Sequence, residues 1–347
     1  MQQTGYTRAS TLGPIAEVVT AAGGSIERVF RRADLPLVLL DSPDTLLPLR
    51  DHFRLLMVTS RELHDEVFAA RLGRQASMTG LGVFGRWVAQ ASTLLEAIQR
   101  AGTSLPHMLQ NATHLVVRRY GSEIHWSYEV SDPARDGRLQ NDMLAIWYMI
   151  AVVRHFAGAC WLPDRIVLGG LPGRLRCQTG ELMCTDTAIG EAASAIVFDR
   201  RLLTSINPHL GQDDGLAASE LGRVFDLPGP EDLPGHVSVL IDLELLDRRP
   251  TLARIGSRSG LTRRTLQRRL GAVGLSYSDL LRNALQRRAV KLLCQADRSI
   301  GEIAALLGYD DPSHFSRAFE RWSGVPPSNW RRLLEARGGP APHPSGG

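Results

Sequence analysis

The fold of the C-terminal part is decided by residues 299–331, which have the sequence S-I-G-E-I-A-A-L-L-G-Y-D-D-P-S-H-F-S-R-A-F-E-R-W-S-G-V-P-P-S-N-W-R. Apolar residues recur there at three- and four-residue intervals on both sides of Gly308, which predicts two short amphipathic helices. Glycine suits the end of the first helix, while Asp311 and Pro312 suit the cap and first turn of the second. The apolar positions are Ile300, Ile303, Ala304 and Leu307 in the first helix, and Phe315, Ala318, Phe319 and Trp322 in the second.

The second of these helices carries hydrogen-bonding and cationic side chains on its remaining face. Arginine, histidine and serine side chains can contact phosphates and the edges of bases. A helix that is anchored by one apolar face and offers such groups on the other fits the DNA major groove. The stretch therefore predicts a helix-turn-helix motif, called the second motif below, whose candidate DNA-binding residues are Ser313, His314, Ser316, Arg317 and Arg321.

An earlier segment, residues 251–270, repeats the pattern as T-L-A-R-I-G-S-R-S-G-L-T-R-R-T-L-Q-R-R-L and is called the first motif. Gly256, Gly260 and Leu266 stand where a helix-turn-helix needs a small residue between its helices, a glycine in its turn and an apolar anchor. Thr262 suits the N-cap of the second helix, whose N-terminus can also approach a phosphate. The chain is therefore predicted to hold two copies of one motif.

The second helix of the first motif directs several polar side chains outwards when its leucines face the core. Arginine pairs bidentately with guanine and glutamine with adenine, so such a face can read base sequence. One arginine-rich helix alone is more typical of a solvated surface, but two copies on one basic segment favour DNA binding. Besides Thr262, the candidate DNA-binding residues of this motif are Arg263, Arg264, Gln267 and Arg268.

A single helix is predicted between the two motifs, at residues 278–295. At 1.5 Å per residue this helix spans roughly 27 Å. With the width of the flanking helices added, the two recognition helices would lie about 34 Å apart, which is one turn of DNA. The two motifs are therefore expected to enter successive major grooves on one face of a duplex, with some bending of the DNA.

Length and charge agree with this arrangement. A chain of 347 residues with 44% apolar and 22% charged residues is expected to form about two globular domains. Its net charge of +4 is unevenly distributed, because residues 236–332 carry +8 and the remainder carries −4. A basic C-terminal domain beside a mildly acidic body indicates that the C-terminal domain binds a polyanion.

The N-terminal part alternates between helical and strand periodicity. Gly121-Ser122 suits the turn of a hairpin between two of the strands. Such a pattern predicts an α+β domain in which helices cover an antiparallel sheet. Helices are predicted at residues 12–32, 49–72 (with a break near 60–63), 93–109 and 139–159, and strands at residues 114–120, 123–129, 165–168, 185–189 and 195–198.

Composition divides the chain into four parts. Residues 1–205 form the N-terminal domain, and residues 206–235, rich in proline, glycine and aspartate, form a linker with a short helix near 217–225. Residues 236–332 form an all-α domain in which a long helix joins the two helix-turn-helix motifs. Residues 333–347, with their closing run of glycine and proline, are predicted to be a disordered tail.

The sequence offers little support for other classes of protein. No apolar run reaches the roughly 18 residues of a membrane span, and the N-terminus lacks the layout of a secretory signal, so a cytoplasmic location is expected. The four cysteines have no metal-ligand spacing, so neither a metal nor a cofactor is expected. Gly80, Gly82 and Gly85 match G-x-G-x-x-G, but no strand precedes them and no acidic residue follows about 20 positions later. An enzyme is therefore not expected.

Residues 236–332 resemble the DNA-binding domain of the AraC/XylS family of transcriptional regulators. The resemblance lies in T-R-R-T-L-Q-R-R-L of the first motif, R-R-A-V-K-L-L of the connecting helix and the whole of the second motif. It implies that Arg264, Gln267 and Arg268 of the first motif contact bases. The corresponding positions of the second motif are Ser313, His314 and Arg317.

Two departures from the family pattern fall in the first motif. Gly256 stands where the family usually has alanine, and Ser259 replaces a usual apolar residue. A glycine within a helix lowers stability by up to about 1 kcal/mol relative to alanine. The first motif is therefore expected to be less stable than the second, although it carries most of the base-reading chemistry.

The N-terminal domain resembles the ligand-binding and dimerisation domain of the arabinose-binding-domain subgroup, which includes regulators of ornithine use and of mycobacterial virulence. The matching stretches are G-L-G-V-F-G-R-W-V-A-Q-A-S-T-L-L-E-A-I, W-L-P-D-R-I-V-L and A-I-V-F-D-R-R-L-L. The resemblance implies a homodimeric transcription factor, more often an activator, that binds promoter DNA, works with RNA polymerase and responds to a small-molecule effector, often amino-acid-like. Candidate effector-binding residues, for which core packing is the alternative, are Trp126, Tyr128, Trp147, Tyr148 and His155.

One other function stays open, and one enzymatic alternative is not favoured. A constitutive nucleoid or accessory protein would bind DNA with little sequence preference and without an effector. A DNA-repair methyltransferase fused to this type of domain would need a metal-bound cysteine cluster, which four scattered cysteines do not supply.

Overall fold

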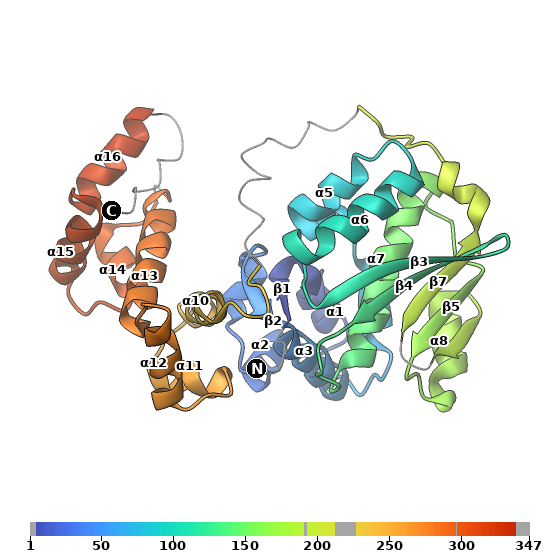
Figure 1. The fold of residues 1–347 in the computed structure, drawn as a ribbon, viewed down its shortest axis with the longest axis horizontal. Coiled ribbons are helices and arrows are strands. Elements are labelled where there is room, and N and C mark those ends of the chain that lie inside the picture. The colour runs from blue at the N-terminus through green and yellow to red at the C-terminus, as the bar shows by residue number, and fades with distance from the viewer. Residues whose placement is uncertain (1–4, 191–192, 212–226, 296, 338–347) are drawn as a thin grey trace. The chain divides into compact units, whose positions relative to one another are not determined.

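The computed structural model describes residues 5–190, 193–211, 227–295 and 297–337, and the chain divides into two compact units between Glu231 and Asp232 (Figure 1). The first unit combines helices with two sheets, whereas the described part of the second unit consists of helices. This architecture confirms the predicted fold class, an α+β region followed by an all-helical C-terminal domain.

The main sheet of the first unit has five strands in the order β3-β4-β7-β5-β6. The predicted hairpin is formed by β3 and β4 and turns at Gly121, whose φ of 61° suits glycine. The prediction of a purely antiparallel sheet is wrong for β5 and β6, which are parallel because helix α8 (Arg176–Met183) carries the chain back between them. The strands are β3 (Thr113–Tyr120), β4 (Glu123–Val130), β5 (Arg165–Gly169), β6 (Thr187–Gly190) and β7 (Ser194–Asp199), and a separate sheet pairs β1 (Tyr6–Arg8) with β2 (Leu46–Pro48).

The helices of the first unit follow most of the predicted ranges. The helix predicted at 12–32 is instead two helices, because Gly23 with a φ of 78° ends the first and Ser25 caps the second. The break predicted in 49–72 occurs between α3 and α4, and Thr93 caps α6 as its position suggests. The α-helices are α1 (Ile15–Ala21), α2 (Ile26–Arg32), α3 (Leu49–Glu62), α4 (Phe68–Gln75), α5 (Gly82–Ala89), α6 (Leu94–Met108), α7 (Arg138–Ala157) and α8, with short 3-10 turns at Ala9–Leu12, Leu37–Asp41, Thr79–Leu81, Gly173–Leu175 and Arg200–Thr204.

Helices α6 and α7 cover the main sheet, as Figure 1 shows. α6 packs against β3, and α7 packs against β4, β5 and β7. The buried large apolar side chains of β4 alternate along the strand, namely Ile124, Trp126 and Tyr128, because successive side chains of a strand point to opposite faces. The core of the first unit therefore lies between this sheet and its helices.

The glycines of the G-x-G-x-x-G match do not form a dinucleotide loop, and Gly85 is required by packing. The element before them is the helix α4, whereas a dinucleotide loop follows a strand. A Cβ on Gly85 would lie 1.8 Å from the backbone oxygen of Met78, so glycine is required where α5 meets the preceding turn.

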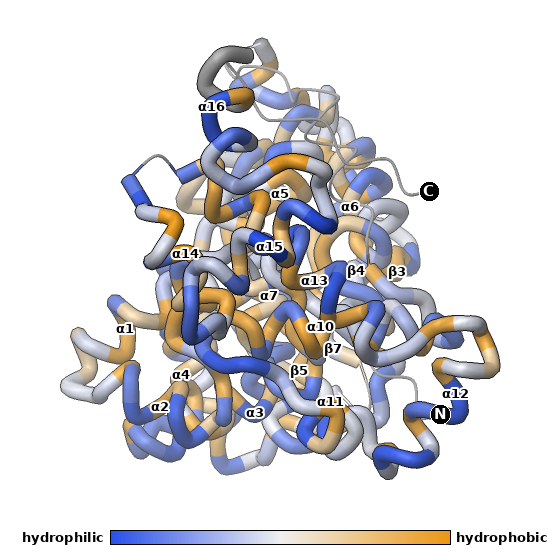
Figure 2. The backbone as a smooth tube through the Cα atoms, turned by 90° about the vertical axis from the view of Figure 1, so that its left-hand side faces the viewer, coloured by the Kyte–Doolittle hydropathy of each residue, from blue (hydrophilic) through white to orange (hydrophobic). Residues whose placement is uncertain are grey.

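Seven helices make up the described part of the second unit. Along them orange and blue segments alternate in Figure 2, as expected of helices that bury one face. Their apolar faces form one core that includes Leu266, Leu270, Phe315 and Phe319. The helices are α10 (Leu233–Glu244), α11 (Leu252–Arg258), α12 (Arg263–Ala272), α13 (Tyr277–Leu293), α14 (Ile300–Leu306), α15 (Pro312–Ser323) and α16 (Pro327–Arg337).

The helices of the second unit extend beyond the predicted limits of residues 236–332. α10 begins at Leu233 because Asp232 accepts a hydrogen bond from the backbone N–H of Gly235 at 2.9 Å and caps the helix. α16 continues to Arg337, five residues past the predicted end of the domain at residue 332. The helix predicted at 217–225 and the tail beyond residue 337 lie outside the described residues.

Candidate functional site

The first motif consists of α11, a turn at Gly260 and α12. Gly260 has a φ of 66°, the left-handed conformation that this turn requires. Thr262 caps α12 by accepting a hydrogen bond from the backbone N–H of Thr265 at 3.2 Å. Leu266 and Leu270 are fully buried, so one face of α12 is fixed to the core and the opposite face is available to a ligand.

The exposed face of α12 carries the predicted DNA-binding residues. No ion pair links Arg263, Arg264 or Arg268 to a carboxylate of the described residues, so their charges are not neutralised within the unit. Arginines whose charges are not paired within the protein can bind phosphates and the edges of bases when the core holds their helix in place. The residues exposed there are Thr262, Arg263, Arg264, Gln267 and Arg268.

The second motif likewise consists of two helices, α14 and α15, joined by a turn at Gly308. Ser299 and Glu302 form a capping box that starts α14, and Gly308 with a φ of 75° ends it. Asp311 caps α15 by accepting a hydrogen bond from the backbone N–H of Ser313 at 2.7 Å. Phe315 and Phe319 bury the inner face of α15. Ser313, His314, Arg317 and Arg321 are exposed on its outer part, and Ser316 is half-buried.

The predicted connecting helix is present as α13. It starts at a capping box formed by Ser276 and Asp279 and has 17 residues, which corresponds to roughly 26 Å of helix. Arg287 of α13 donates to Asp242 of α10 at 2.9 Å, which adds an exposed ion pair to the apolar contacts. The structure therefore places one continuous helix between the two motifs.

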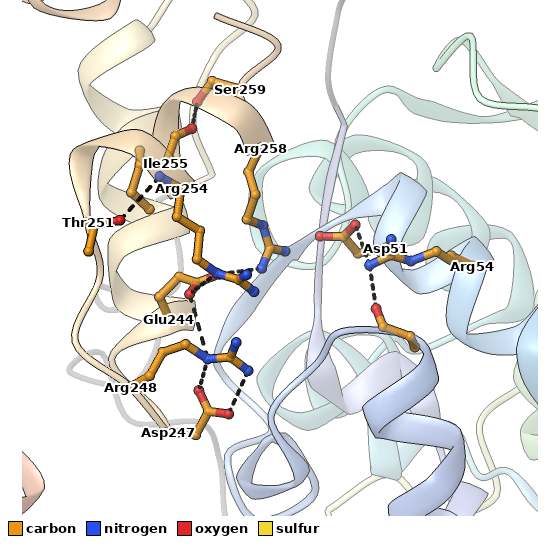
Figure 3. Close-up of polar contacts among 11 residues, drawn as sticks. Asp51, Arg54, Glu244, Asp247, Arg248, Thr251, Arg254, Ile255, Arg258 and Ser259 are labelled. Atoms are coloured by element: carbon orange, nitrogen blue, oxygen red, sulfur yellow. Dashed lines mark hydrogen bonds and ion pairs between the residues drawn. The ribbon is translucent and has the colours of Figure 1, made fainter. Parts of the chain in front are cut away.

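Glu244 at the end of α10 holds the first motif to the rest of the unit, a role that the sequence analysis missed. Its side chain is 1% exposed and accepts hydrogen bonds from Arg254 Nε at 2.6 Å and Arg258 Nη1 at 2.7 Å, both on α11 (Figure 3). Arg248 Nε lies 3.8 Å from the same carboxylate. The available signal was a glutamate inside the apolar run L-I-D-L-E-L-L, where a charge needs a partner.

Gly256 and Ser259, the two departures in the first motif, have local structural roles. A Cβ on Gly256 would lie 2.9 Å from the backbone oxygen of Leu261, so the glycine lets α11 approach the turn closely. The Ser259 hydroxyl donates to the backbone oxygen of Ile255 at 2.8 Å. This polar group at the end of α11 therefore has a hydrogen-bond partner. The expected loss of stability at Gly256 stays a prediction, with this close approach as an opposing effect.

The first unit contains a cavity between the sheet and its helices. The space that the centre of a water molecule can occupy there is about 70 Å³. Its walls come from α3, α5, α6, α7, β3 and β4. The lining residues are Thr11, His52, Leu81, Phe84, Ala101, Leu105, Leu109, Gln110, Leu115, Trp126, Tyr128, Asn141, Leu144, Ala145, Tyr148, Met149 and Val152.

Three of the five predicted effector-binding residues line this cavity, namely Trp126, Tyr128 and Tyr148. Trp147 packs against α4 instead, where a Cβ on Gly73 would lie 2.5 Å from its ring. His155 lies against the rings of Phe156 and His209, with centroid distances of 5.3 and 4.8 Å. Neighbours on a helix point about 100° apart, so Trp147 and Tyr148 face different surroundings.

Polar residues that complete the cavity wall were not among the predicted effector-binding residues. Gln110 Nε2 donates to the Tyr128 hydroxyl at 2.5 Å, and Asn141 Nδ2 donates to the same oxygen at 3.0 Å. Burial raises the pKa of Tyr128 to about 12 and lowers the pKa of His52 from 6.5 to about 4, so both are neutral near pH 7. Asn141 could have been found from its spacing, because it lies three, four and seven positions before Leu144, Ala145 and Tyr148 on one helix face.

Other chemistry is absent from the part of the chain that the structure describes. All four cysteines are free thiols at the surface. No group of three or more histidine, cysteine or acidic side chains is arranged to hold a metal within the described ranges. No helix there combines the length and the hydrophobicity of a membrane span.

Comparison with known proteins identifies both parts of the chain. The family model for the arabinose-binding domain of AraC transcription regulators, an N-terminal domain, matches residues 23–206, and a helix-turn-helix domain model matches residues 255–333. The HTH-type transcriptional regulator VirS of Mycobacterium tuberculosis is 26% identical over 351 residues, which cover 95% of this chain and 98% of VirS.

Two further proteins share parts of this similarity. The ornithine utilization regulator of Pseudomonas aeruginosa is 40% identical over 68 residues, which are 20% of each chain. The crystal structure of the transcriptional regulator CdpR from Pseudomonas aeruginosa aligns with 92% of this chain and 96% of its own at 20% identity, with a TM-score of 0.41.

The two family models and the similarity to VirS confirm the resemblance inferred from the sequence. The N-terminal family model alone spans more than half of the chain, and the helix-turn-helix model contains most of both motifs. Proteins of this kind regulate transcription and are not enzymes. The chain belongs to the AraC family of transcription regulators and is a DNA-binding regulator with an N-terminal effector-binding domain.

Proposed function

We propose that this regulator is a homodimeric, cytoplasmic activator that binds a promoter operator through both helix-turn-helix motifs and acts with RNA polymerase. A small molecule bound in the cavity of the first unit controls it. The observation that carries the proposal is the pair of anchored helices, α12 and α15, which both present exposed cationic and hydrogen-bonding side chains. Two such helices on one basic unit match the two half-elements of an extended operator.

In this proposal each helix combines base contacts with phosphate contacts. Arg264, Gln267 and Arg268 of α12 provide donors that match guanine and adenine edges in the major groove. His314 and Arg317 of α15 occupy the same part of the second motif, and Ser313, at the N-terminus of α15, is suited to a phosphate as well as to a base. The first motif therefore supplies more of the specificity, and both supply affinity.

Effector control in this proposal is a shift between populations rather than chemistry. A molecule that fills the cavity stabilises the arrangement of α6, α7 and the sheet in which the cavity is closed around it. It changes DNA binding or activation only to the extent that it binds one arrangement of the regulator better than the other.

The experiment that tests this function selects genomic fragments with the full-length chain and sequences them. We expect enrichment of one motif with two half-elements about 10 base pairs apart, centre to centre. The double variant Arg264→Ala/Arg317→Ala should lose this enrichment. Uniform recovery of fragments by the parent chain would favour the alternative, an effector-independent accessory or nucleoid protein.

A further inference from the structure

The cavity of the first unit has a chemical character that narrows the class of its ligand. We propose that it binds an uncharged, largely apolar molecule about the size of a single ring, which accepts a hydrogen bond from the indole N–H of Trp126. The inference rests on the proposed effector control, and it contrasts with the amino-acid-like effector that the family resemblance suggests. It follows from the charge, the polar groups and the size of the cavity.

None of the described lining residues is aspartate, glutamate, lysine or arginine. The nearby buried carboxylate of Asp142 does not line the cavity and is already engaged, because Arg138 Nε lies 3.2 Å away and the Ser194 hydroxyl donates to it at 2.8 Å. A ligand carboxylate or ammonium group would lose its hydration without gaining an opposite charge.

The titratable lining residues do not supply a charge either. Burial holds the pKa of His52 near 4, and it raises the pKa of Tyr128 to about 12 and that of Tyr148 further. All three side chains are therefore neutral near pH 7. An amino acid, which carries two charges at that pH, finds no counter-charge on any of the described walls.

Trp126 is 1% exposed, and its indole nitrogen has no hydrogen-bond acceptor among the described residues. An indole N–H can only donate, so a buried one without a partner is unfavourable until an acceptor arrives. His52 is also 1% exposed, and neither of its ring nitrogens has a hydrogen bond of good geometry to a described residue. The Asn141 side chain and the Thr11 backbone lie close enough to oppose, in part, the lowering of its pKa by burial.

These groups define the polar part of the ligand. Trp126 demands an acceptor, such as a carbonyl or ether oxygen. Neutral His52 offers one donor and one acceptor and can adapt to either kind of ligand group. One acceptor atom of the ligand therefore satisfies Trp126, a second polar group could pair with His52, and most of the remaining wall is apolar.

The cavity offers about 70 Å³ to water centres, several times the ~10–15 Å³ that a single water molecule needs. Apolar residues of α5, α6, α7 and β3 form most of its wall, among them Phe84, Leu105, Leu115 and Met149. This is the mix of an apolar pocket with few polar groups that binds small organic molecules.

Three probes of nearly equal size separate the effect of ligand charge from the effect of a hydrogen-bond acceptor. Acetophenone is neutral and has a carbonyl acceptor, benzoate has a charged carboxylate, and 2-phenylpropene is neutral without an acceptor. Binding to the full-length chain is followed by thermal shift and by the indole N–H resonances of tryptophan-labelled protein. The Trp126 resonance is assigned as the one missing in Trp126→Phe.

Acetophenone is expected to bind, to shift the Trp126 N–H resonance and to raise the melting temperature. Benzoate should do neither at the same concentration. Because 2-phenylpropene lacks one neutral hydrogen bond, its affinity is expected to be roughly 3- to 10-fold lower than that of acetophenone. In Trp126→Phe this preference should disappear while both neutral probes still bind, an effect that a general loss of structure would not produce.

A matched pair of substitutions on α7 locates the site. Ala145 lines the cavity, so Ala145→Leu fills it and should abolish binding of acetophenone. Ala151 lies on the same helix but does not line the cavity, so Ala151→Leu should bind as the parent does. Circular dichroism of both variants checks that the helices are retained.

The inference is overturned if benzoate binds as well as acetophenone, if acetophenone does not bind, or if Ala145→Leu binds it unchanged while folded. These outcomes leave the proposed function in place whenever charged metabolites alter operator binding. The proposed function fails separately, through the absence of sequence-selective DNA binding by the full chain, whatever the cavity binds.

Discussion

The carboxylate of Glu244 accepts a hydrogen bond from Arg258 Nη1 at 2.7 Å, and this contact ties α11 of the first motif to α10. Arg254 donates to the other carboxylate oxygen at 2.6 Å, so one acidic side chain serves two residues of the same helix. Because the Glu244 side chain is 1% exposed, water cannot easily replace either arginine. The placement of α11 therefore depends on one buried ion-pair cluster.

Glu244→Gln keeps the size of the side chain and removes its charge. We expect it to lower the free energy of unfolding of the second unit by about 2–3 kcal/mol, which is less than the ~3–5 kcal/mol of a fully buried pair because Arg254 and Arg258 are 32% and 12% exposed. Urea unfolding measures the change. Glu320→Gln, at an exposed position of α15, is the control and should be nearly neutral. Equal stability of the two variants would show that the cluster does not hold α11.

Gly256 and Gly271 provide a matched pair of helical glycines. No atom of the described residues lies within 4 Å of a Cβ on Gly271, so Gly271→Ala in α12 should raise stability by about 0.5–1 kcal/mol through helix propensity. A Cβ on Gly256 meets the Leu261 backbone oxygen at 2.9 Å, so Gly256→Ala should lose this gain or become destabilising. Thermal unfolding of both variants measures the difference. A stabilising Gly256→Ala would support the view that this glycine loosens the first motif.

The second motif could be predicted in detail because its signals are local. Its caps, its turn glycines and its apolar spacing all lie within residues 299–331, and Asp311 and Gly308 take the predicted roles. The short strands β1 and β2 had no such signal, since they have three residues each and pair across about 40 positions. The parallel pair β5 and β6 depends on the path of α8, which periodicity does not reveal.

The cavity was harder to predict than the DNA-binding face. Its wall joins His52 of α3, Gln110 after α6 and Asn141 of α7, which are far apart in the sequence. Aromatic residue type alone did not separate Tyr148, which lines the cavity, from the adjacent Trp147, which does not. The exposed arginines of α12, in contrast, follow directly from the buried leucines beside them.

His52 makes the stability of the first unit depend on pH. Its pKa is about 4 in the folded chain and 6.5 ordinarily, so between these values the unfolded chain binds more protons and stability rises with pH. The contribution is present above about pH 6.5 and is lost as the pH falls towards 4. We expect this residue to lower stability by about 2 kcal/mol between about pH 7.5 and about pH 5.

Two variants isolate this contribution. His52→Gln stays neutral, so its stability should fall less than that of the parent over the same pH interval. His114→Gln replaces an exposed histidine of β3 and should follow the parent. Unfolding curves at both pH values give the comparison, and parallel pH dependence in all three proteins would rule out His52 as the source.

Arg264 and Arg317 test the assignment of the two reading helices. Both are exposed, one on α12 and one on α15, and neither forms an ion pair with a described carboxylate. Replacement of either by alanine should cost roughly 1–3 kcal/mol of specific binding, with relaxed base preference at the positions that it reads. Fluorescence anisotropy with the selected operator at fixed salt measures the loss.

Arg269→Ala is the control, because it removes an equal charge at the end of α12, outside the predicted contact set. It should slightly weaken binding to every DNA sequence without changing the base preference. Unchanged affinity of both test variants for the operator would mean that other residues read the bases.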